Sequence, residues 1–255
     1  MTRLISGAIL AGAALAAILF LPTEALRYVA VAVAVLAAHE YVRVAGAAGR
    51  SRWLIVVAVV LACLLMTAWF ALDPVAVMVA AIAWMAVEVL FLGHTIHQAT
   101  VGLFAPIYIG VPLGMLVAIQ DTLGHRGTLL LIAAVIVSDS AQYYSGRAFG
   151  RHQLAPSISP KKTIEGAVGG VVLGTAFMAL AGPRIFPTLA MPWLWVGLTV
   201  VILGILGDLF ESRMKRVAGL KDSSTLIPGH GGVLDRIDAL LFAIPAFYLF
   251  LRAAR

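Results

Sequence analysis

The chain has 255 residues, of which 62% are hydrophobic and 12% are charged, and its formal net charge is +6. Soluble domains carry about 25% charged residues, so this composition excludes an ordinary soluble enzyme. It also argues against nucleic acid as a partner, because basic residues in short loops between apolar runs reflect membrane topology and contact with anionic headgroups. The single cysteine, Cys63, lies in an apolar run and excludes a disulfide framework.

Apolar runs of about 20 residues, long enough to cross a bilayer as a helix, recur along the whole chain. They predict an all-α fold, a polytopic integral membrane helix bundle with about nine transmembrane helices. The predicted spans are residues 4–21, 25–45, 53–72, 74–93, 99–119, 128–147, 164–182, 192–211 and 231–251. The first run also fits a cleaved signal peptide, but its length and the close start of the second run favour a retained helix.

Positive charges in the loops predict the orientation of these spans. With a cytoplasmic N-terminus, twelve lysines and arginines fall on the cytoplasmic side and five on the other, with Arg236 inside the last span. This orientation in the inner membrane puts the polar loops 148–163 and 212–230 in the cytoplasm, where nucleoside triphosphates are present. Within a single membrane domain, residues 1–125 are predicted to form scaffold helices and residues 126–255, which hold most of the charge, the catalytic region.

Carboxylates cluster in the predicted spans of the C-terminal half. Asp139 lies in the sixth span, Asp208 and Glu211 in the eighth, and Asp235 and Asp238 in the ninth. Each one costs several kcal/mol in a membrane and marks a functional site by default, although pairing with a nearby cation to hold helices together is the alternative. Carboxylates at one depth repel each other unless a cation neutralises them, and hard oxygen ligands suit Mg²⁺ bound together with substrate phosphates.

The first polar loop carries cations directly before a predicted helix. In SPKKTIEG, which begins at Ser159, Lys161 and Lys162 precede a helix that has Thr163 at its N-cap and Glu165 in its first turn. Cations beside a helix N-terminus make an anion site. This loop is therefore predicted to bind phosphate.

The second polar segment, residues 212–238, alternates basic residues with serine and aspartate and ends in a Gly-His-Gly-Gly turn. Ordinary positive-inside topology is the alternative explanation for its basic residues, but it does not explain the turn. Gly231 and Gly232 there let backbone amides approach a ligand closely. Because the turn leads directly into Asp235, we predict that this segment belongs to the same site.

These motifs resemble a known family. Residues 212–238, read as S-x-M-K-R, four residues, K-D-x-S and then P-G-H-G-G-V-x-D-R-I-D, resemble the signature of phosphatidate cytidylyltransferases, the CDP-diacylglycerol synthases. SPKKTIEG is similar to a second motif of that family, and Asp139 stands where its members have an acidic span. The resemblance covers about residues 135–245; before them it rests on hydropathy and on Glu40. One departure is Ser-Ala-Gln-Tyr after Asp139, where the family has a smaller residue before the aromatic one.

The resemblance implies condensation of CTP with phosphatidic acid to give CDP-diacylglycerol and pyrophosphate, in a homodimer. It implies a centre of Mg²⁺ with K⁺ as a second ion, and two Mg²⁺ ions remain the alternative. The expected catalytic residues are Asp208, Asp235, Asp238, Lys215 and Lys221, with Asp208, Asp235 and Ser212 as metal ligands. The expected substrate- and phosphate-binding residues are Ser159, Lys161, Lys162, Thr163, Glu165, Ser212, Arg216, Asp222, His230, Gly231, Gly232, Arg236 and Asp139.

Histidines are assigned no catalytic role. His230 is expected to contact substrate or support the turn, because a phosphate monoester is already ionised at neutral pH and needs no general base. His94 and His97 are expected in a solvated loop without acidic partners. The competing functions are a CDP-archaeol-type synthase, a polyprenol kinase, and a transporter, which predicts inverted repeats that the sequence does not show.

Overall fold

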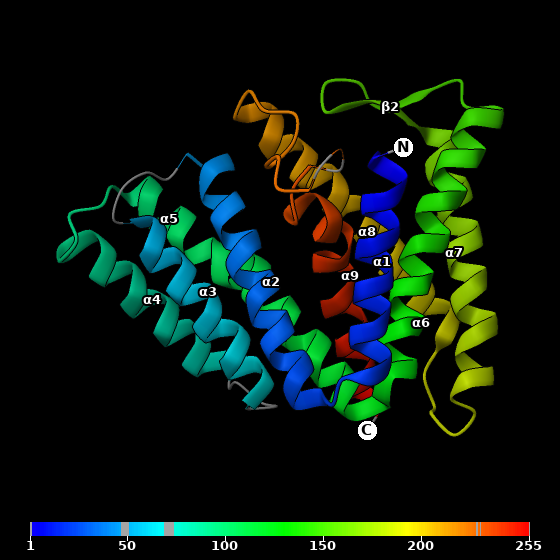
Figure 1. Cartoon of the computed structure of the whole chain (residues 1–255), viewed down its shortest axis with the longest axis horizontal. Helices are drawn as coiled ribbons and strands as arrows, with labels where there is room; N and C mark the ends of the chain where they lie inside the picture. Colours follow the sequence, from blue (N-terminus) through cyan, green and yellow to red (C-terminus); the bar gives the residue numbers. More distant parts are fainter. Residues whose placement is uncertain (1, 47–50, 69–73, 228, 230, 255) are drawn as a thin grey trace. The chain divides into compact units, whose positions relative to one another are not determined.

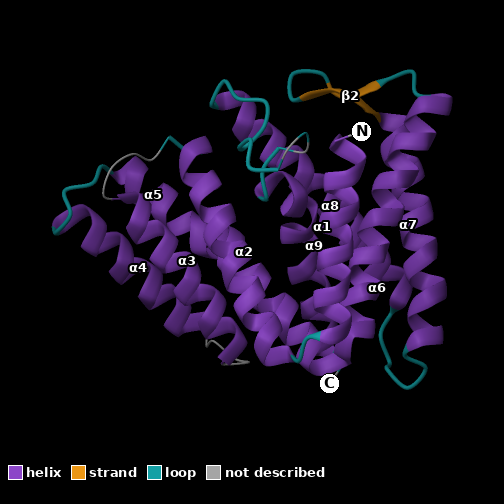
Figure 2. Cartoon of the chain, in the orientation of Figure 1, coloured by secondary structure: helices purple, strands orange, loops and turns teal. Residues whose placement is uncertain are grey.

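The computed structural model describes residues 2–46, 51–68, 74–227, 229 and 231–254. Most of them lie in helices, and the strands of the described chain form one hairpin (Figure 2). The helices, in chain order (Figure 1), are α1 (Thr2–Phe20), α2 (Thr23–Val44), α3 (Ser51–Ala68), α4 (Pro74–Leu90), α5 (Ile96–Ala105), the π-helix η1 (Pro106–Gly110), α6 (Val111–Phe149), α7 (Ile164–Ile185), α8 (Trp193–Val217) and α9 (Leu234–Ala253).

Several of these helices fit a membrane. Four helical segments of the described chain are long and apolar enough to cross one, namely Thr23–Val44, Ile96–Phe149, Ile164–Ile185 and Trp193–Val217. Helices suit the interior of a bilayer because their backbone N–H and C=O groups form hydrogen bonds within the helix. The predicted all-α integral membrane protein is confirmed in this form, whereas the count of about nine spans stays a prediction. The third predicted span runs into residues 69–73, which lie outside the described chain.

The hairpin is the departure from the purely helical prediction. Strand β1 (Gln153–Ala155) pairs antiparallel with β2 (Ser159–Thr163), so the sequence SPKKT forms a strand instead of a loop. The Gln153 side chain strengthens the pairing by donating to the carbonyl of Pro160 at 3.1 Å. Pairing with β1 fixes the backbone that carries Lys161 and Lys162.

The described residues divide into two compact units. Unit 1 consists of Met1–Asp121 and Asp222–Asp235, and unit 2 of Thr122–Lys221 and Arg236–Arg255. A sharp bend in α6 lies close to one boundary, because Gly124 has φ 66° and ψ −172° inside the helix. A left-handed φ of this kind favours glycine. The bend falls between the fifth and sixth predicted spans, which the structure therefore joins through a kinked helix.

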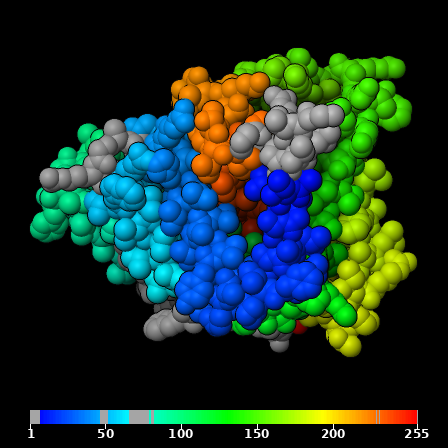
Figure 3. Space-filling view, viewed as in Figure 1, coloured from blue at the N-terminus to red at the C-terminus, as the bar shows by residue number. Residues whose placement is uncertain are grey.

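In unit 1, small side chains let α2 pack closely. Ala34, Ala37 and Ala38 are fully buried, and Figure 3 shows α2 in blue and α3 in cyan as adjoining surfaces. Next along α2, Tyr41 packs on Phe104 with ring centroids 6.4 Å apart, and its hydroxyl donates to the carbonyl of Val101 at 3.3 Å. These contacts fix the end of α2 that carries Glu40.

His94 lies in the predicted loop between α4 and α5, but the expectation that it is solvated and has no acidic partner is wrong. Its side chain is 13% exposed, and its Nδ1 lies 3.4 Å from a carboxylate oxygen of Glu88, which is itself buried in α4. His97 is exposed in the first turn of α5. The acidic partner of His94 precedes it by six residues and sits in a helix that reads as uniformly apolar, so the local sequence did not reveal it.

In unit 2, glycines bring α7 directly against α6 (Figure 1). A Cβ on Gly166 would lie 2.7 Å from the carbonyl oxygen of Gln142, and one on Gly170 would lie 3.0 Å from that of Ser138. Neither position tolerates a side chain without a shift of backbone. This close approach places the start of α7, the end of β2 and one face of α6 around the same space.

Candidate active site

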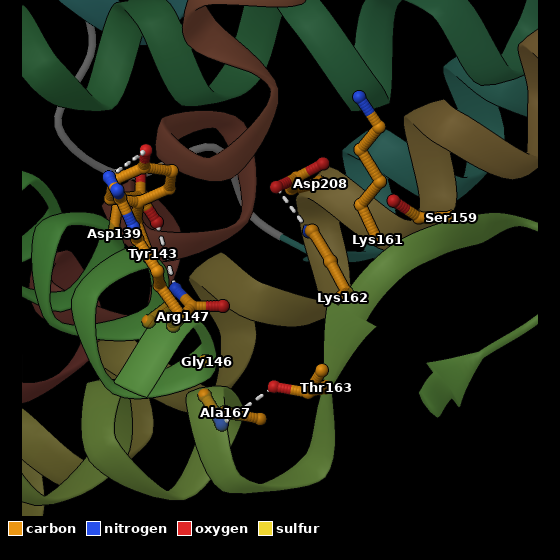
Figure 4. Close-up of a pocket in the computed structure, with 12 residues that line it drawn as sticks. Asp139, Tyr143, Gly146, Arg147, Ser159, Lys161, Lys162, Thr163, Ala167 and Asp208 are labelled. Atoms are coloured by element: carbon orange, nitrogen blue, oxygen red, sulfur yellow. Dashed lines mark hydrogen bonds and ion pairs between the residues drawn. The ribbon is translucent and has the colours of Figure 1, made fainter. Parts of the chain in front are cut away.

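A cavity of about 600 Å³ opens in unit 2, where α6, the hairpin, α7 and α8 meet (Figure 4). Six of the predicted site residues line it. They are Asp139, Ser159, Lys161, Lys162, Thr163 and Asp208. Three elements that are separate in the sequence therefore bring carboxylates and cations to one cavity, as expected of a site that binds a charged ligand together with a counter-ion.

An ion pair between Lys162 and Asp208 connects β2 to α8 across this cavity. The Lys162 ammonium donates to Oδ2 of Asp208, and the side chains are 22% and 31% exposed. The other oxygen of Asp208 accepts a hydrogen bond from the Ser212 hydroxyl, one helical turn further along α8, at 3.4 Å. The predicted pair Asp208 and Ser212 therefore presents its oxygens together.

Asp139 enters the cavity from α6. Its Oδ1 accepts a hydrogen bond from the amide of Gln142 at 2.9 Å. On the same helical face, the Arg147 guanidinium lies near the Tyr143 hydroxyl, with 3.5 Å between the nitrogen and the oxygen (Figure 4). Gln142, Tyr143 and Arg147 line the cavity although the sequence reasoning missed them.

A sequence signal for the missed residues exists. Gln142, Tyr143 and Gly146 follow Asp139 at spacings of three, four and seven residues, which is one face of a helix. Projecting the helix from Asp139 would have found them.

The start of α7 is capped as the sequence predicted. The Thr163 hydroxyl accepts the Gly166 N–H at 3.1 Å, which satisfies one of the free donors of the first turn. Glu165 does not line the cavity. Its carboxylate accepts the N–H groups of Arg151 and His152 at 3.0 and 3.2 Å. It thereby ties the end of α6 to the start of α7, and its predicted contact with substrate remains a prediction.

Asp238, on α9, belongs to the same electrostatic environment. The charges of Asp208, Lys215 and Asp139 all act on its carboxylate, and the N–H of Ala239 donates to it at 2.7 Å. Lys215 forms an ion pair with Glu211, whose side chain is fully buried in α8. Unit 2 therefore gathers acidic side chains from α6, α8 and α9 and balances them with lysines.

The remaining predicted cations of unit 2 do not line the cavity. Arg216 holds the hairpin turn, because its guanidinium donates to the carbonyls of Ile158 and Leu220 at 3.2 and 3.1 Å. Lys221 is exposed after the end of α8, and Arg236 is exposed in the first turn of α9. Their predicted roles in catalysis and binding remain predictions.

The other predicted residues lie in unit 1, in the segment 222–235. Asp222 is exposed there. The Asp235 carboxylate accepts the N–H of Ser223 at 3.0 Å and that of Gly232 at 2.7 Å. A Cβ on Gly231 would lie 2.5 Å from Oδ2 of Asp235, so this turn requires glycine. His230 lies outside the described residues.

Glu40, at the end of α2, holds this segment through both of its carboxylate oxygens. Oε1 accepts from the Ser224 hydroxyl at 2.7 Å and from the N–H of Val233 at 3.0 Å. Oε2 accepts from the Ser223 hydroxyl at 3.0 Å and from the N–H of Leu234 at 2.7 Å. The carboxylate is buried, and the role of Glu40 is to position the segment that bears Asp235.

These side chains fit a magnesium ion that is completed by substrate. Among the described residues, no three His, Cys, Asp or Glu side chains group as a metal site by themselves. Mg²⁺ commonly takes only one or two carboxylates and fills its other positions with water and phosphate oxygens. Asp139 and Asp208 offer hard oxygen donors to the cavity, and Ser212 adds a hydroxyl beside Asp208.

Apolar helices around a cavity lined by lysines and aspartates define an integral membrane protein with a charged internal site. The chain belongs to the cytidylyltransferase family, whose model matches residues 1–254. It is 46% identical over 137 residues to a phosphatidate cytidylyltransferase of Haemophilus influenzae, covering 49% of this chain and 46% of that protein.

Two further relatives are similar to the chain over comparable lengths. A phosphatidate cytidylyltransferase of Bacillus subtilis is 36% identical over 152 residues, 58% of this chain and 56% of that protein. An uncharacterised protein of Escherichia coli, YnbB, is 38% identical over 162 residues, 62% of this chain and 54% of that protein. The chain thus spans about half the length of the curated relatives that it matches.

Proposed function

We propose that the protein is a phosphatidate cytidylyltransferase that converts CTP and phosphatidic acid into CDP-diacylglycerol and pyrophosphate. A lipid phosphate oxygen forms a bond to the α-phosphorus of CTP. The bond from this phosphorus to the oxygen that bridges to the β-phosphorus breaks, and pyrophosphate leaves. Membership of the family and the similarity to two phosphatidate cytidylyltransferases support this reaction.

The observation that carries the proposal is the cavity of unit 2, where Lys161, Lys162 and Arg147 line the same space as Asp139 and Asp208. A triphosphate needs cations along its length, and the leaving pyrophosphate gains negative charge as the reaction proceeds. Fixed cations in a partly dehydrated site stabilise that charge.

The lipid phosphate is already an anion at neutral pH, so the residues need to position the reactants in line more than to remove a proton. Lysine and arginine side chains are suited to this task because they bind phosphate oxygens without becoming covalently involved.

Mg²⁺, held by Asp208 and Ser212 with Asp139 close by, would supply charge neutralisation between the phosphates. The Lys162 ammonium, which donates to Asp208, would also bind a phosphate oxygen. Asp235 remains a predicted ligand, and K⁺ the predicted second ion.

The membrane arrangement is proposed from the sequence. We place about nine spans in the inner membrane with the polar loops in the cytoplasm, because twelve of the loop cations fall on that side. A homodimer is proposed by resemblance to the family.

The test uses purified protein in detergent with phosphatidic acid and radiolabelled CTP, and follows cytidine that extracts with the lipid. We expect a product that requires Mg²⁺ and disappears on chelation. Asp208→Asn should lower its rate at least 100-fold, since removal of one preorganised electrostatic group costs about 10²–10³ in rate. Glu24→Gln is the matched control, because Glu24 is a 72% exposed carboxylate that pairs with Arg27.

Absence of cytidine-labelled lipid from folded wild-type protein, with K⁺ present, would overturn the proposed reaction. Label that appears on another phosphorylated lipid but not on phosphatidic acid would reassign the acceptor to a related lipid. Transfer of the γ-phosphate from CTP to a polyprenol would identify a kinase instead.

A further inference from the structure

A second cavity, of about 510 Å³, lies in unit 2 and shares no lining residue with the candidate active site. On α6 it is lined by Arg126, Leu129, Leu130 and Ala133. These positions are spaced three, four and seven residues apart and so form one helical face. We call this cavity the arginine groove, after Arg126 and the arginine that faces it from α7.

α7 contributes the other wall of the groove. Gly170 and Gly174 hold α7 against Ser138 of α6, but the next residue toward the C-terminus that faces α6 is the large side chain of Phe177. Beyond these two glycines, Phe177 of α7 lines the same cavity as Leu130 and Ala133 of α6. Arg184 lies two turns beyond Phe177 on the same face and closes the groove at its charged end.

The groove has an apolar wall and a purely positive end. Arg126 and Arg184 are its charged lining residues, and no carboxylate lines it. Both side chains are exposed, and one nitrogen of Arg184 donates to the carbonyl of Leu180 at 2.6 Å. A guanidinium carries five N–H donors, so this bond leaves others for a ligand. Arg184 lies in the last turn of α7, and Arg126 follows the bend of α6 at Gly124. Arginines at the ends of membrane helices are suited to contact anionic headgroups.

We propose that the arginine groove binds one anionic phospholipid. Its phosphate lies between Arg126 and Arg184, which bind phosphate oxygens through paired N–H groups. An acyl chain lies along Leu129, Ala133 and Phe177. The apolar wall selects a lipid over a soluble anion, and the groove volume falls within the range of about 300–1,000 Å³ that is usual for ligand sites.

The arginine groove would keep one lipid bound to unit 2. This proposal does not depend on the reaction proposed for the other cavity. Binding is tested with purified protein in mixed micelles of equal amounts of phosphatidylglycerol and phosphatidylcholine. Native mass spectrometry measures the ratio of the two lipids that remain bound. We expect the wild-type protein to retain one phosphatidylglycerol in preference to phosphatidylcholine, also in excess inorganic phosphate.

Charge and shape are varied separately. A basic residue at the membrane surface contributes about a fivefold preference for anionic lipid, so Arg126→Gln should lower the preference about fivefold and Arg126→Gln with Arg184→Gln about thirtyfold. Ala133→Leu keeps both charges and fills the apolar wall, and it should also release the lipid. Arg252→Gln removes an exposed arginine from the last turn of α9, outside the groove, and should leave the bound lipid in place.

Three outcomes would overturn the proposal. One is an equal loss of phosphatidylglycerol in Arg252→Gln, which would show general surface attraction. Another is unchanged binding in Ala133→Leu, which would show that no chain enters the groove. The third is displacement of phosphatidylglycerol by inorganic phosphate, which would show a soluble anion site.

Discussion

Replacing Glu40 by glutamine should loosen the segment 222–235 in unit 1 while changing the shape of the buried side chain very little. Each carboxylate oxygen of Glu40 accepts one serine hydroxyl and one backbone N–H. In the glutamine variant one oxygen becomes an NH₂ group, which cannot accept. A serine hydroxyl can turn around and accept from it, but the N–H of Val233 or of Leu234 cannot.

One buried N–H of the segment is therefore left without an acceptor in the glutamine variant. Such a group costs about 1–3 kcal/mol, which corresponds to a roughly 5- to 150-fold increase in the population of the opened segment. The loss of negative charge adds to this cost, because hydrogen bonds to a charged acceptor are stronger than those to a neutral one.

Hydrogen exchange at the amides of Val233 and Leu234 measures the opening directly. We expect the exchange of one of the two to accelerate by the factor above in Glu40→Gln. Glu24→Gln changes the same chemical group on the exposed first turn of the same helix, and should leave both rates unchanged. If both amides exchanged in Glu40→Gln as slowly as in the wild type, Glu40 would not be what holds the segment.

Further predictions concern unit 2. Thr163→Val removes the N-cap acceptor of α7, which is worth about 1 kcal/mol, so the amide of Gly166 should exchange roughly fivefold faster; an unchanged rate would mean that the cap contributes nothing. Gly170→Leu should lower the thermal unfolding midpoint, because overpacking costs about 1–3 kcal/mol, whereas Gly12→Leu, with open space around it, should not; equal midpoints would contradict the close packing of α6 and α7. Lys162→Met should reduce kcat/KM for CTP about 100-fold in the lipid-labelling assay, and wild-type activity would remove this lysine from the site.

The sequence was most informative where the signal is local. Thr163 was predicted to cap a helix, and it does so, because capping needs only residues three apart. The six predicted residues that line one cavity were each found from a short segment of sequence. In each segment the types of charged and polar side chain indicate what the segment can bind. The pairing of Lys162 with Asp208, 46 residues apart, was not predicted, since no local pattern records which loop meets which helix.

Composition and motifs by themselves determined that the chain is an all-α membrane protein and which family it resembles. Both can be judged within one short segment, because a segment's hydropathy decides whether it enters a membrane and its own side chains make up the motif. The tertiary structure decided the rest. It formed a hairpin from SPKKT, placed Glu88 beside His94, and set Glu40 against Ser223, 183 residues away. It also formed the arginine groove between α6 and α7. Such contacts depend on how closely helices approach, which is fixed by packing among distant residues.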